Sequence, residues 1–593
     1  MCGIAGFYGH KICEDVLINF LEKLEYRGYD SSGIAIKQNN KINLIKNTFK
    51  INELKENVTT KTENAIGIAH TRWATHGKVN KENAHPHYSQ NKVWYAVHNG
   101  IIENYMELKK DLLKNKVKFY SQTDSEIIPQ LLEYQKVNDI HSFINTINQL
   151  KGSYAICAVN NFQNSMYLAK NKSPLYIAKQ NDEYYIASDP ICFVDITNEY
   201  YTLNDNEYCV VFDNKLKFFN NKHKFINKKT NKLNSKYMKC TKENYSTFME
   251  KEINEIPKVF ENIIEEYKHN NYFEHINKNF LSAKRLVIIG CGTAYHSGLI
   301  GAKWLEKTLN IPTQTELASE FISNEPIINK DTIYIFVSQS GETADTLNAL
   351  NLVNGKCKTT IAITNVTYSR IAQIVDIVLP VFAGPEIAVA STKAYNAQLL
   401  IFYMLCEYLK SFKLSLNFFN KTLKELNKID ISNMYHFNNL SKIIPNYNSM
   451  FILGKYTDYY TSLEASLKIR EITYSNCSAL ATGELKHGTL ALVSNDTTCI
   501  IISTHKKLHS KTISAINEIK ARNGKIVLVT CDIQSFDNCK LIDYFIPIPN
   551  LDNENLNDIV SVIPFQLFAL QLSLSKNIDP DKPRNLAKSV TVE

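Results

Sequence analysis

Short apolar runs separated by polar turns cover the first two hundred residues of this 593-residue chain. Residues 10–25 carry apolar side chains three or four positions apart, which predicts a helix. Later runs alternate or stay apolar only briefly, and these predict strands at 33–36, 66–70, 93–98 and 154–159. The pattern predicts an α/β layered domain.

The second half of the chain repeats one strand–helix pattern. A short apolar strand ends at Gly290, and another ends at Gly454, 164 positions later. The next strands end at Ser338 and Ser503, 165 positions apart. A nearly constant offset predicts two copies of one unit. Each copy alternates parallel-type strands with helices, which predicts a flavodoxin-like three-layer α/β/α fold.

A lysine- and asparagine-rich stretch from about residue 215 to 244 separates the two halves. It has little periodicity, and its densest basic part contains no arginine. A nucleic-acid arm would interleave arginine and aromatic residues, so a solvated linker is favoured. A helix then starts at Phe248, and Pro257 interrupts or restarts it. We predict a first domain at 2–218, a linker at 219–245, α/β copies at 246–435 and 436–580, and a tail at 581–593.

Composition excludes several classes of protein. The longest apolar runs, such as 286–289 and 499–502, have strand length, and the N-terminus lacks a signal peptide's apolar core. The 13 cysteines form no CxxC pair, so a disulfide framework or zinc ribbon is not indicated. The net charge of +8 is small for this length. We expect a cytoplasmic protein with no nucleic-acid partner, no membrane contact, no metal and no cofactor.

A cysteine directly after the initiator methionine is the first candidate nucleophile. Once Met1 is removed, Cys2 would carry a thiol and a free α-amine, which titrate near ~8.5 and ~7.7. The amine could then act as base for the thiol, as in terminal-threonine nucleophiles. Taken alone, Cys2 is better interpreted as an incidental cysteine, and only the later motifs favour the nucleophile.

Polar residues gather where predicted strands end. Asn99-Gly100 is a common hairpin pair, but its side-chain amide and glycine N–H could also form two adjacent donors for an oxyanion. Arg72 could grip a carboxylate and Asp124 an ammonium, although a surface ion pair is the ordinary interpretation of both. Together these residues would hold an α-amino acid and present its side chain to Cys2.

Six motifs in order resemble the class II glutamine amidotransferases of the N-terminal-nucleophile fold, an αββα sandwich: MCGIAG, LEYRGYDSSG, AHTRWATHG, NAHPH, VHNGIIEN and SQTDSE. The resemblance implies that Cys2 attacks the amide of L-glutamine. It assigns Asn99 and Gly100 to the oxyanion hole. The remaining implied residues are Arg72, Thr75, His76 and Asp124 for glutamine binding and Trp73 as the gate of an ammonia channel.

The loop from Ser338 to Thr343 follows a predicted strand and enters a helix. Hydroxyls and free N–H groups at a helix N-terminus can cradle a phosphate, but a plain serine N-cap is the common alternative. No GxxxxGK[ST] motif is present, and Tyr295 stands at the third glycine of a possible GxGxxG, so neither nucleotide site is supported. A sugar phosphate suits this loop better, and 389–393 is a second candidate lining.

The second copy carries candidate acid–base groups. Glu464, Lys468 and Glu471 share one face of a predicted helix at 462–474, either as a solvated salt-bridge stripe or as a proton-transfer pair. His487 lies in a loop with glycines on both sides. The tail is nearly uncharged beyond Lys588, which predicts that it is tucked in.

The motifs CGTAYHSG, SQSGETADT, VASTKA, GELKHG and RNLAKSVTVE resemble sugar isomerase (SIS) domains. With the N-terminal motifs, the whole chain resembles a family of glutamine-dependent aminotransferases that isomerise D-fructose 6-phosphate. The resemblance implies a homodimer that binds the sugar phosphate through Thr293, Ser338, Gln339, Ser340, Thr343, Val389 and Ser391.

The same resemblance implies the roles of the remaining residues. Lys588 would form a Schiff base at C2, which requires a neutral amine, and His487 would reach the neighbouring subunit's site to open the sugar ring. Glu471, assisted by Lys468, would move a proton from C1 to C2. Ala294 and Thr489 depart from the family pattern, where serine and proline are usual.

Two alternatives come from other classes of function. Other class II amidotransferases would need an ATP pyrophosphate loop or a diphosphate-sugar motif, and we find neither. A sugar-phosphate-sensing SIS regulator would have empty catalytic positions, whereas Glu471, His487 and Lys588 are all present.

Overall fold

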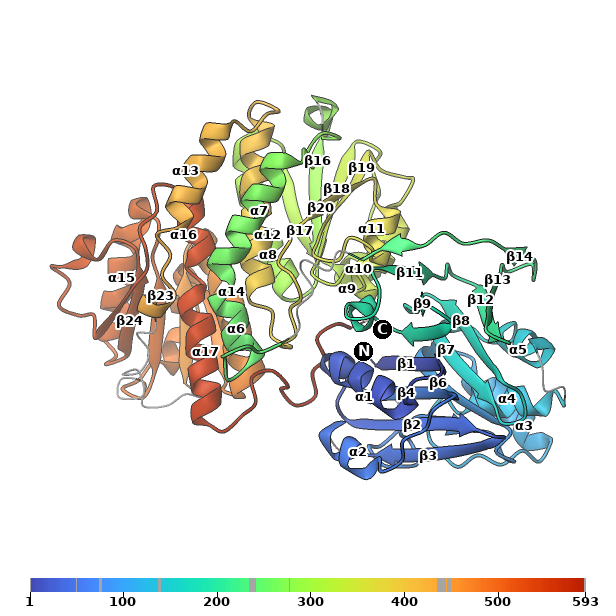
Figure 1. Ribbon diagram of the computed structural model, residues 1–593. Coiled ribbons are helices and arrows are strands. Elements are labelled where there is room, and N and C mark those ends of the chain that lie inside the picture. The colour runs from blue at the N-terminus through green and yellow to red at the C-terminus, as the bar shows by residue number, and fades with distance from the viewer. Residues whose placement is uncertain are drawn as a thin grey trace. The chain divides into compact units, whose positions relative to one another are not determined.

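The structure is a computed structural model that describes residues 2–48, 51–73, 77–136, 140–233, 241–276, 278–434, 444 and 449–590. The chain divides into two compact units (Figure 1). The first contains Met1–Cys240 with Ala587–Glu593, and the second contains Thr241–Leu586. Each unit is described by itself.

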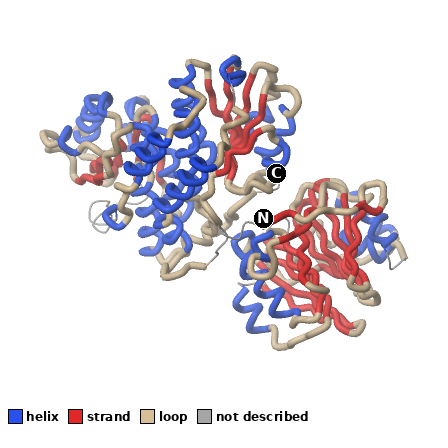
Figure 2. Tube along the Cα trace, turned by 45° about the horizontal axis from the view of Figure 1, so that its top comes forward, coloured by secondary structure: helices blue, strands red, loops and turns tan. Residues whose placement is uncertain are grey.

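The first unit is built on two antiparallel sheets, visible as strands in Figure 2. In spatial order, the eight-stranded sheet contains β15 (Asn231–Lys232), β11 (Glu199–Thr202), β9 (Tyr176–Gln180), β10 (Glu183–Ala187), β1 (Gly3–Gly9), β4 (Ala65–Arg72), β2 (Ser31–Gln38) and β3 (Lys41–Asn47). The seven-stranded sheet contains β14 (Phe225–Ile226), β13 (Lys215–Phe219), β12 (Glu207–Phe212), β8 (Ser165–Asn171), β7 (Gly152–Asn160), β6 (Trp94–Ile102) and β5 (His87–Tyr88).

The two sheets bury apolar side chains against each other. Ile4 and Ile68 from one sheet and Val97 and Cys157 from the other belong to one fully buried cluster. The helices are α1 (Cys13–Leu24), α2 (Ile51–Asn57), α3 (Tyr105–Lys114), α4 (Ile127–Tyr134) and α5 (Ile140–Ile147). Helix α1 contacts β1 and β4, and α4 contacts β6, so helices cover both sheets. This confirms the predicted αββα sandwich.

The strands of the first unit continue into the stretch that we expected to be a linker from residue 219. Strand β14 pairs with β13, and β15 pairs with β11. The segment therefore adds short edge strands to both sheets. The lysine- and asparagine-rich composition gave no strand pattern here, because edge strands need not bury an apolar face.

The second unit opens with α6 (Phe248–Asn254) and α7 (Ile256–His269). Thr247 caps α6 by accepting a hydrogen bond from the Glu250 N–H, and Pro257 stands in the first turn of α7, where no N–H is needed. The first parallel sheet has the order β17 (Thr313–Leu317), β16 (Arg285–Gly290), β18 (Thr332–Ser338), β19 (Thr359–Thr364) and β20 (Ile377–Pro380). Its helices are α8 (Thr293–Leu309), α9 (Ala318–Ser323), α10 (Ala344–Val353), α11 (Arg370–Ile374), α12 (Lys393–Leu409) and α13 (Leu416–Leu426).

The second parallel sheet repeats this topology. Its order is β22 (Cys477–Ala481), β21 (Met450–Gly454), β23 (Thr498–Ile502), β24 (Lys525–Thr530) and β25 (Tyr544–Pro547). Its helices are α14 (Thr457–Thr473), α15 (His509–Lys520), α16 (Glu554–Val560) and α17 (Ile563–Ser575). Both sheets therefore follow one strand order, which confirms the two predicted three-layer α/β/α copies.

The duplication extends to backbone angles. Helices α8 and α14 each contain 17 residues, and each follows a residue with positive φ. That residue is Gly292 (φ 53°, ψ −125°) in the first copy and Tyr456 (φ 62°, ψ −129°) in the second. Asn310 and Tyr474, which end the two helices, are both left-handed. The same turn therefore leads from strand to helix in both copies.

One shared apolar core holds the two copies together. It includes α12 and α17, which are buried along almost their whole length. Within the described residues, the helical stretch Glu554–Ser575 is long and apolar enough to cross a membrane, but 83% of it is buried inside the protein. Its hydrophobicity is accounted for by core packing.

Candidate active sites

The ends of β1, β4 and β6 bring the predicted glutamine-site residues together. The Trp73 N–H donates to Cys2 Sγ at 3.3 Å, and the Cys2 thiol lies 3.5 Å from the Trp73 carbonyl oxygen. From the other sheet, Asn99 Nδ2 donates to the Cys2 carbonyl oxygen at 2.8 Å. The thiol therefore lies where the two sheets meet. The predicted residues Thr75 and His76 lie outside the described residues.

Asn99 and Gly100 are strand residues. They pair with Ala155 and Tyr154 across β6 and β7, so the hairpin interpretation is wrong. Gly100 has φ 123°, and a Cβ there would lie 2.0 Å from the Ser153 carbonyl oxygen. Only glycine fits this approach, and it leaves the backbone beside Asn99 without a covering side chain.

Arg72 and Asp124 are buried, with 3% and 4% of their surfaces exposed, so a surface ion pair is also the wrong interpretation. Asp124 Oδ2 accepts the Ile102 N–H at 2.8 Å, which anchors the carboxylate. The Arg72 guanidinium donates to the carbonyl oxygens of Gly77 and Lys78 at 3.4 Å. A buried guanidinium has the planar fork geometry that can bind a carboxylate bidentately.

Burial raises the pKa of the Cys2 thiol above its ordinary value, although nearby positive charge partly opposes this. At neutral pH the thiol is therefore mostly protonated, and a nucleophilic role requires a base that takes its proton.

The predicted phosphate loop follows β18 and leads into α10. Ser338 Oγ lies 3.0 Å from Thr343 Oγ1 and accepts the Gly341 N–H at 3.0 Å. Ser340 Oγ accepts the Glu342 N–H at 3.2 Å. The N-cap residue of α10 is Thr343, and its side chain makes no capping bond, so the serine N-cap interpretation is wrong. The loop is a ring of hydroxyls at a helix N-terminus, which suits a phosphate.

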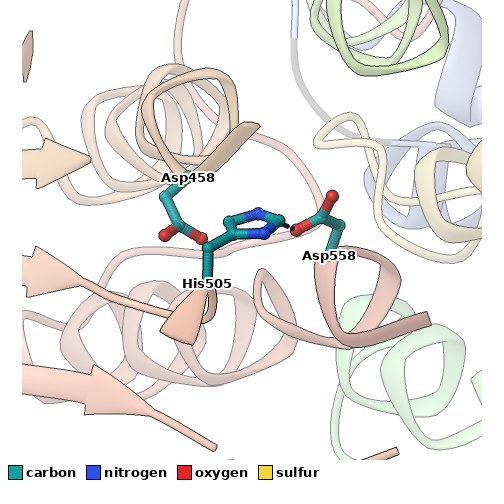
Figure 3. A group of neighbouring side chains, drawn as sticks. All are labelled: Asp458, His505 and Asp558. Carbon is teal, nitrogen blue, oxygen red and sulfur yellow. Dashed lines mark hydrogen bonds and ion pairs between the residues drawn. The ribbon is translucent and has the colours of Figure 1, made fainter. Parts of the chain in front are cut away.

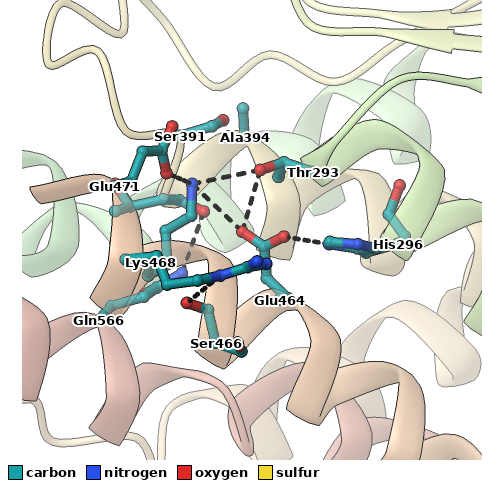
Figure 4. Close-up of polar contacts among 12 residues, drawn as sticks. Thr293, His296, Ser391, Ala394, Glu464, Ser466, Lys468, Glu471 and Gln566 are labelled. Atoms are coloured by element: carbon teal, nitrogen blue, oxygen red, sulfur yellow. Dashed lines mark hydrogen bonds and ion pairs between the residues drawn. The ribbon is translucent and has the colours of Figure 1, made fainter. Parts of the chain in front are cut away.

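The acidic and basic face of α14 is buried. Lys468 and Glu464 have fully buried side chains, and that of Glu471 is 16% exposed. Lys468 Nζ lies 2.7 Å from Glu471 Oε2 and 3.4 Å from Glu464 Oε1 (Figure 4). These contacts exclude the solvated salt-bridge stripe that the sequence left open.

Both copies contribute to this cluster. Thr293 Oγ1 from α8 donates to Glu464 Oε1 at 3.0 Å and accepts from Lys468 Nζ at 3.2 Å. His296 Nδ1, also from α8, lies 2.7 Å from Glu464 Oε2 (Figure 4). Thr293 of the first copy, a predicted sugar-site residue, therefore contacts the ammonium of Lys468 in the second copy directly.

The environment keeps Lys468 charged. Burial alone would lower the pKa of Lys468, but the carboxylates of Glu471 and Glu464 outweigh burial and raise that pKa above its usual value. Lys468 is therefore a permanent cation between two carboxylates near neutral pH, and it can orient Glu471 or stabilise developing negative charge.

The second candidate lining is held by a carboxylate that the sequence analysis missed. Glu386 is buried and accepts hydrogen bonds from Ser391 Oγ at 2.7 Å and from the N–H groups of Thr392 and Ala394 at 2.9 and 3.0 Å. This fixes the turn that follows Val389, whose own N–H donates to the Asp581 carbonyl oxygen. His296 was missed as well. The spacing of Glu464 from Lys468 had placed both on one helix face, whereas no local pattern pointed to Glu386.

The two remaining predicted residues, His487 and Lys588, differ in exposure and in the unit that contains them. His487 is exposed, on the turn after the short helix η7 (Thr482–Lys486). Lys588 is half-buried in the segment Ala587–Glu593, which belongs to the first unit. Ser589 is buried but Val590 is 44% exposed, so the tail is only partly tucked in.

The second copy has a charged cluster where the first has its hydroxyl loop. Asp458, His505 and Asp558 are buried, and one ligand-type atom from each lies within 4.8 Å of the others (Figure 3). His505 Nε2 lies 3.0 Å from Asp558 Oδ1, and both Thr504 donors bind Asp458. Burial alone would lower the pKa of His505, but Asp558 and the neighbouring acids raise it to about 9. The neighbouring acids therefore favour the protonated imidazole, and hydrogen bonds within the protein hold the three groups together.

Comparisons with known proteins find one amidotransferase domain followed by two copies of one α/β domain, as in the fold described above. Residues 279–408 and 443–576 match the SIS domain, and residues 70–195 match a glutamine amidotransferase domain. The glutamine–fructose-6-phosphate aminotransferase (isomerising) of Clostridium tetani is 39% identical, and that of Bacillus cereus 38% identical, over all of both chains. This chain belongs to the glutamine–fructose-6-phosphate aminotransferase family.

A solved structure supports the family fold of the second unit. The C-terminal domain of the Francisella tularensis glucosamine-fructose-6-phosphate aminotransferase matches 58% of this chain and all of its own, with 28% identity and a TM-score of 0.53. Family membership over the full length sets aside the other amidotransferases and the SIS regulator that the sequence left open.

Proposed function

We propose that the chain converts D-fructose 6-phosphate and L-glutamine into glucosamine 6-phosphate and glutamate, the reaction of its family. The observation that carries this is the fully buried Lys468, held between Glu464 and Glu471 and bonded to Thr293. A regulator would have no need of a buried proton-transfer group beside a sugar-phosphate loop.

In the first half-reaction, Cys2 attacks the side-chain amide carbon of glutamine after Met1 has been removed. The α-amine of Cys2 takes the thiol proton, because burial disfavours the thiolate. Asn99 Nδ2 and the Gly100 N–H stabilise the oxyanion, while Arg72 and Asp124 hold the substrate's carboxylate and amine. The family resemblance also assigns Thr75 and His76 to glutamine binding. Ammonia leaves, and water releases glutamate from the thioester.

In the second half-reaction, the phosphate lies on the hydroxyls and amides of Ser338, Gln339, Ser340 and Thr343, with Thr293, Val389 and Ser391 lining the sugar. The Lys588 amine forms a Schiff base at C2 with loss of water, and ammonia then displaces the lysine. Glu471 carries the proton from C1 to C2, which turns the ketose into an aldose, and Lys468 holds Glu471 in place.

Two residues, Trp73 and His487, have proposed roles that extend beyond a single active site. Trp73, the residue whose backbone contacts the Cys2 thiol, gates the passage of ammonia. His487 is exposed in this chain and opens the sugar ring in the neighbouring subunit of a homodimer. All cysteines that the structure describes are free thiols, as suits a reducing, cytoplasmic compartment.

The test follows both products. Glutamine with fructose 6-phosphate should give equal amounts of glutamate and glucosamine 6-phosphate. Cys2→Ser should abolish glutamate release and spare isomerisation of the sugar. Lys588→Arg should do the reverse, with Lys540→Arg, an exposed lysine of the second copy, as the matched control. Glutamate without any amino sugar from the unmodified chain would reject the proposal.

A further inference from the structure

The oxyanion donor Asn99 is itself held by a histidine from the opposite sheet. His70 lies on β4, is fully buried, and places Nε2 3.0 Å from Asn99 Oδ1 and 3.0 Å from the His98 carbonyl oxygen. The mechanism above gives this side chain no task.

Two backbone carbonyls determine how the hydrogens in this group are arranged. The His98 carbonyl can only accept, so His70 Nε2 must carry its proton. The Cys2 carbonyl can only accept, so the Asn99 atom 2.8 Å away must be the amide nitrogen. The Asn99 oxygen then faces the His70 N–H. Each assignment follows from a different carbonyl, and the two agree.

The other ring nitrogen of His70 has no polar partner among the described residues. This atom, Nδ1, is buried without a hydrogen bond, and the ring stacks on His85 with centroids 4.0 Å apart. His85 Nδ1 accepts the His98 N–H, so that ring is unprotonated at Nδ1 as well. Burial lowers the pKa of His70 to about 3, which keeps the ring neutral at any working pH.

We propose that His70 is a positioning residue that locks the Asn99 amide with its nitrogen toward Cys2 and the oxyanion. A rotated amide would turn its oxygen toward the developing negative charge and convert a stabilising donor into a repulsive acceptor. It would also set that oxygen against the Cys2 carbonyl. The proposal rests on the glutaminase role given above.

A matched pair of variants separates the effect of losing the N–H donor from the effect of losing the imidazole ring. Both His70→Gln and His70→Met remove the stacking on His85, and they have similar size, but only glutamine keeps an N–H near the position of Nε2. We expect His70→Met to lower the glutaminase kcat by about 10²-fold, the size of effect seen when an oxyanion donor is lost. His70→Gln should retain kcat to within about tenfold, with KM for glutamine little changed in both.

A double-mutant comparison separates positioning from general packing. In an Asn99→Ala background no amide remains to be oriented, so the Gln and Met variants should have equal rates to within about twofold. Equal rates in the presence of Asn99, or the same large difference in its absence, would overturn the proposal.

A measurement on the unmodified enzyme keeps the proposal testable if either variant fails to fold. With ¹⁵N-labelled histidine, His70 should show the neutral form protonated at Nε2 across pH 6–8. A form protonated at Nδ1 would refute the proposal. Absence of glutamate release from the unmodified enzyme would instead refute the proposed function.

Discussion

The two α/β copies share a backbone but differ in what occupies the same turn. In the first copy, the loop after β18 offers the hydroxyls of Ser338, Ser340 and Thr343 and no charged side chain at those positions. In the second copy, the loop after β23 contains Ser503, Thr504 and His505, and His505 bonds to Asp558. The fold thus supplies two equivalent turns. The first presents neutral hydroxyls, whereas the second carries a charged histidine paired with a carboxylate.

The comparison shows how one duplicated scaffold can hold a single substrate site. An anionic ligand gains from free N–H groups and hydroxyls at a helix N-terminus. The carboxylates of Asp458 and Asp558 would repel the same ligand, and their hydrogen bonds are already made within the protein. The second copy instead contributes α14, whose Lys468 contacts both Glu471 of its own helix and Thr293 of the first copy.

The largest effect is expected where the copies meet. Lys468→Met would leave Glu464 and Glu471 without their shared cation and Thr293 without its donor. We expect glucosamine 6-phosphate formation to fall by about 10³-fold, within the range for acid–base groups, with glutamate release in the absence of sugar unchanged. Lys507→Met, at an exposed lysine of the second copy, is the control. Retained synthase activity would disconnect α14 from the chemistry.

A negative charge in the predicted phosphate loop of the first copy should weaken the binding of fructose 6-phosphate. Ser340→Asp places a carboxylate where the phosphate is expected, and like charges in contact cost several kcal/mol. KM for fructose 6-phosphate should rise by about 10²-fold. Steady-state kinetics with Ser340→Thr, which keeps the hydroxyl, provide the matched measurement. If Ser340→Asp binds the sugar normally, the phosphate lies elsewhere.

Breaking the second copy's cluster should affect stability and leave catalysis intact. Asp558→Asn keeps the size of the side chain but removes the carboxylate that contacts His505 Nε2 and Trp304 Nε1. We expect the free energy of unfolding to fall by roughly 2–3 kcal/mol, because the imidazolium loses a buried partner. Urea unfolding and kcat should be compared with Asp537→Asn, at an exposed aspartate. A large fall in kcat would show that the second turn serves catalysis.

The same cluster makes stability depend on pH. The pKa of His505 is about 9 in the folded protein and near 6.5 when unfolded, so the folded state binds more protons between these values. The stabilisation is complete below pH 6.5 and is lost as the pH rises to 9, by roughly 3 kcal/mol. Burial raises the pKa of Asp458 to about 6, so that group has already ionised in this window. Urea unfolding of His505→Gln should lack the slope; an identical slope would assign it to another group.

The smallest effect concerns the shared turn itself. Gly292→Ala adds a Cβ that meets no atom within 4 Å but must adopt φ 53°. We expect a loss of about 1 kcal/mol from backbone strain alone, which Tyr456 already tolerates at the equivalent position. Gly483→Ala, which also meets no atom and has no positive φ, should cost nothing measurable by thermal unfolding.

Local patterns were sufficient for the elements and for the residues that lie within one loop. The constant offset between Gly290 and Gly454 predicted the duplicated sheets, and the hydroxyls after β18 predicted the phosphate loop. Asn99-Gly100 could be read as a hairpin or as an oxyanion site, because the same dipeptide serves both. The pairing of both residues within β6 excludes the hairpin turn.

What the sequence determined by itself is the architecture and the chemistry of single segments, since these depend on periodicity and on neighbours along the chain. Only the tertiary structure decided that His296 meets Glu464 across two copies, that His70 reaches Asn99 from another sheet, and that Asp458, His505 and Asp558 close on one another. These contacts join helices and strands far apart in the chain. They arise from how apolar faces pack, and packing places polar side chains together without leaving a spacing that the sequence could reveal.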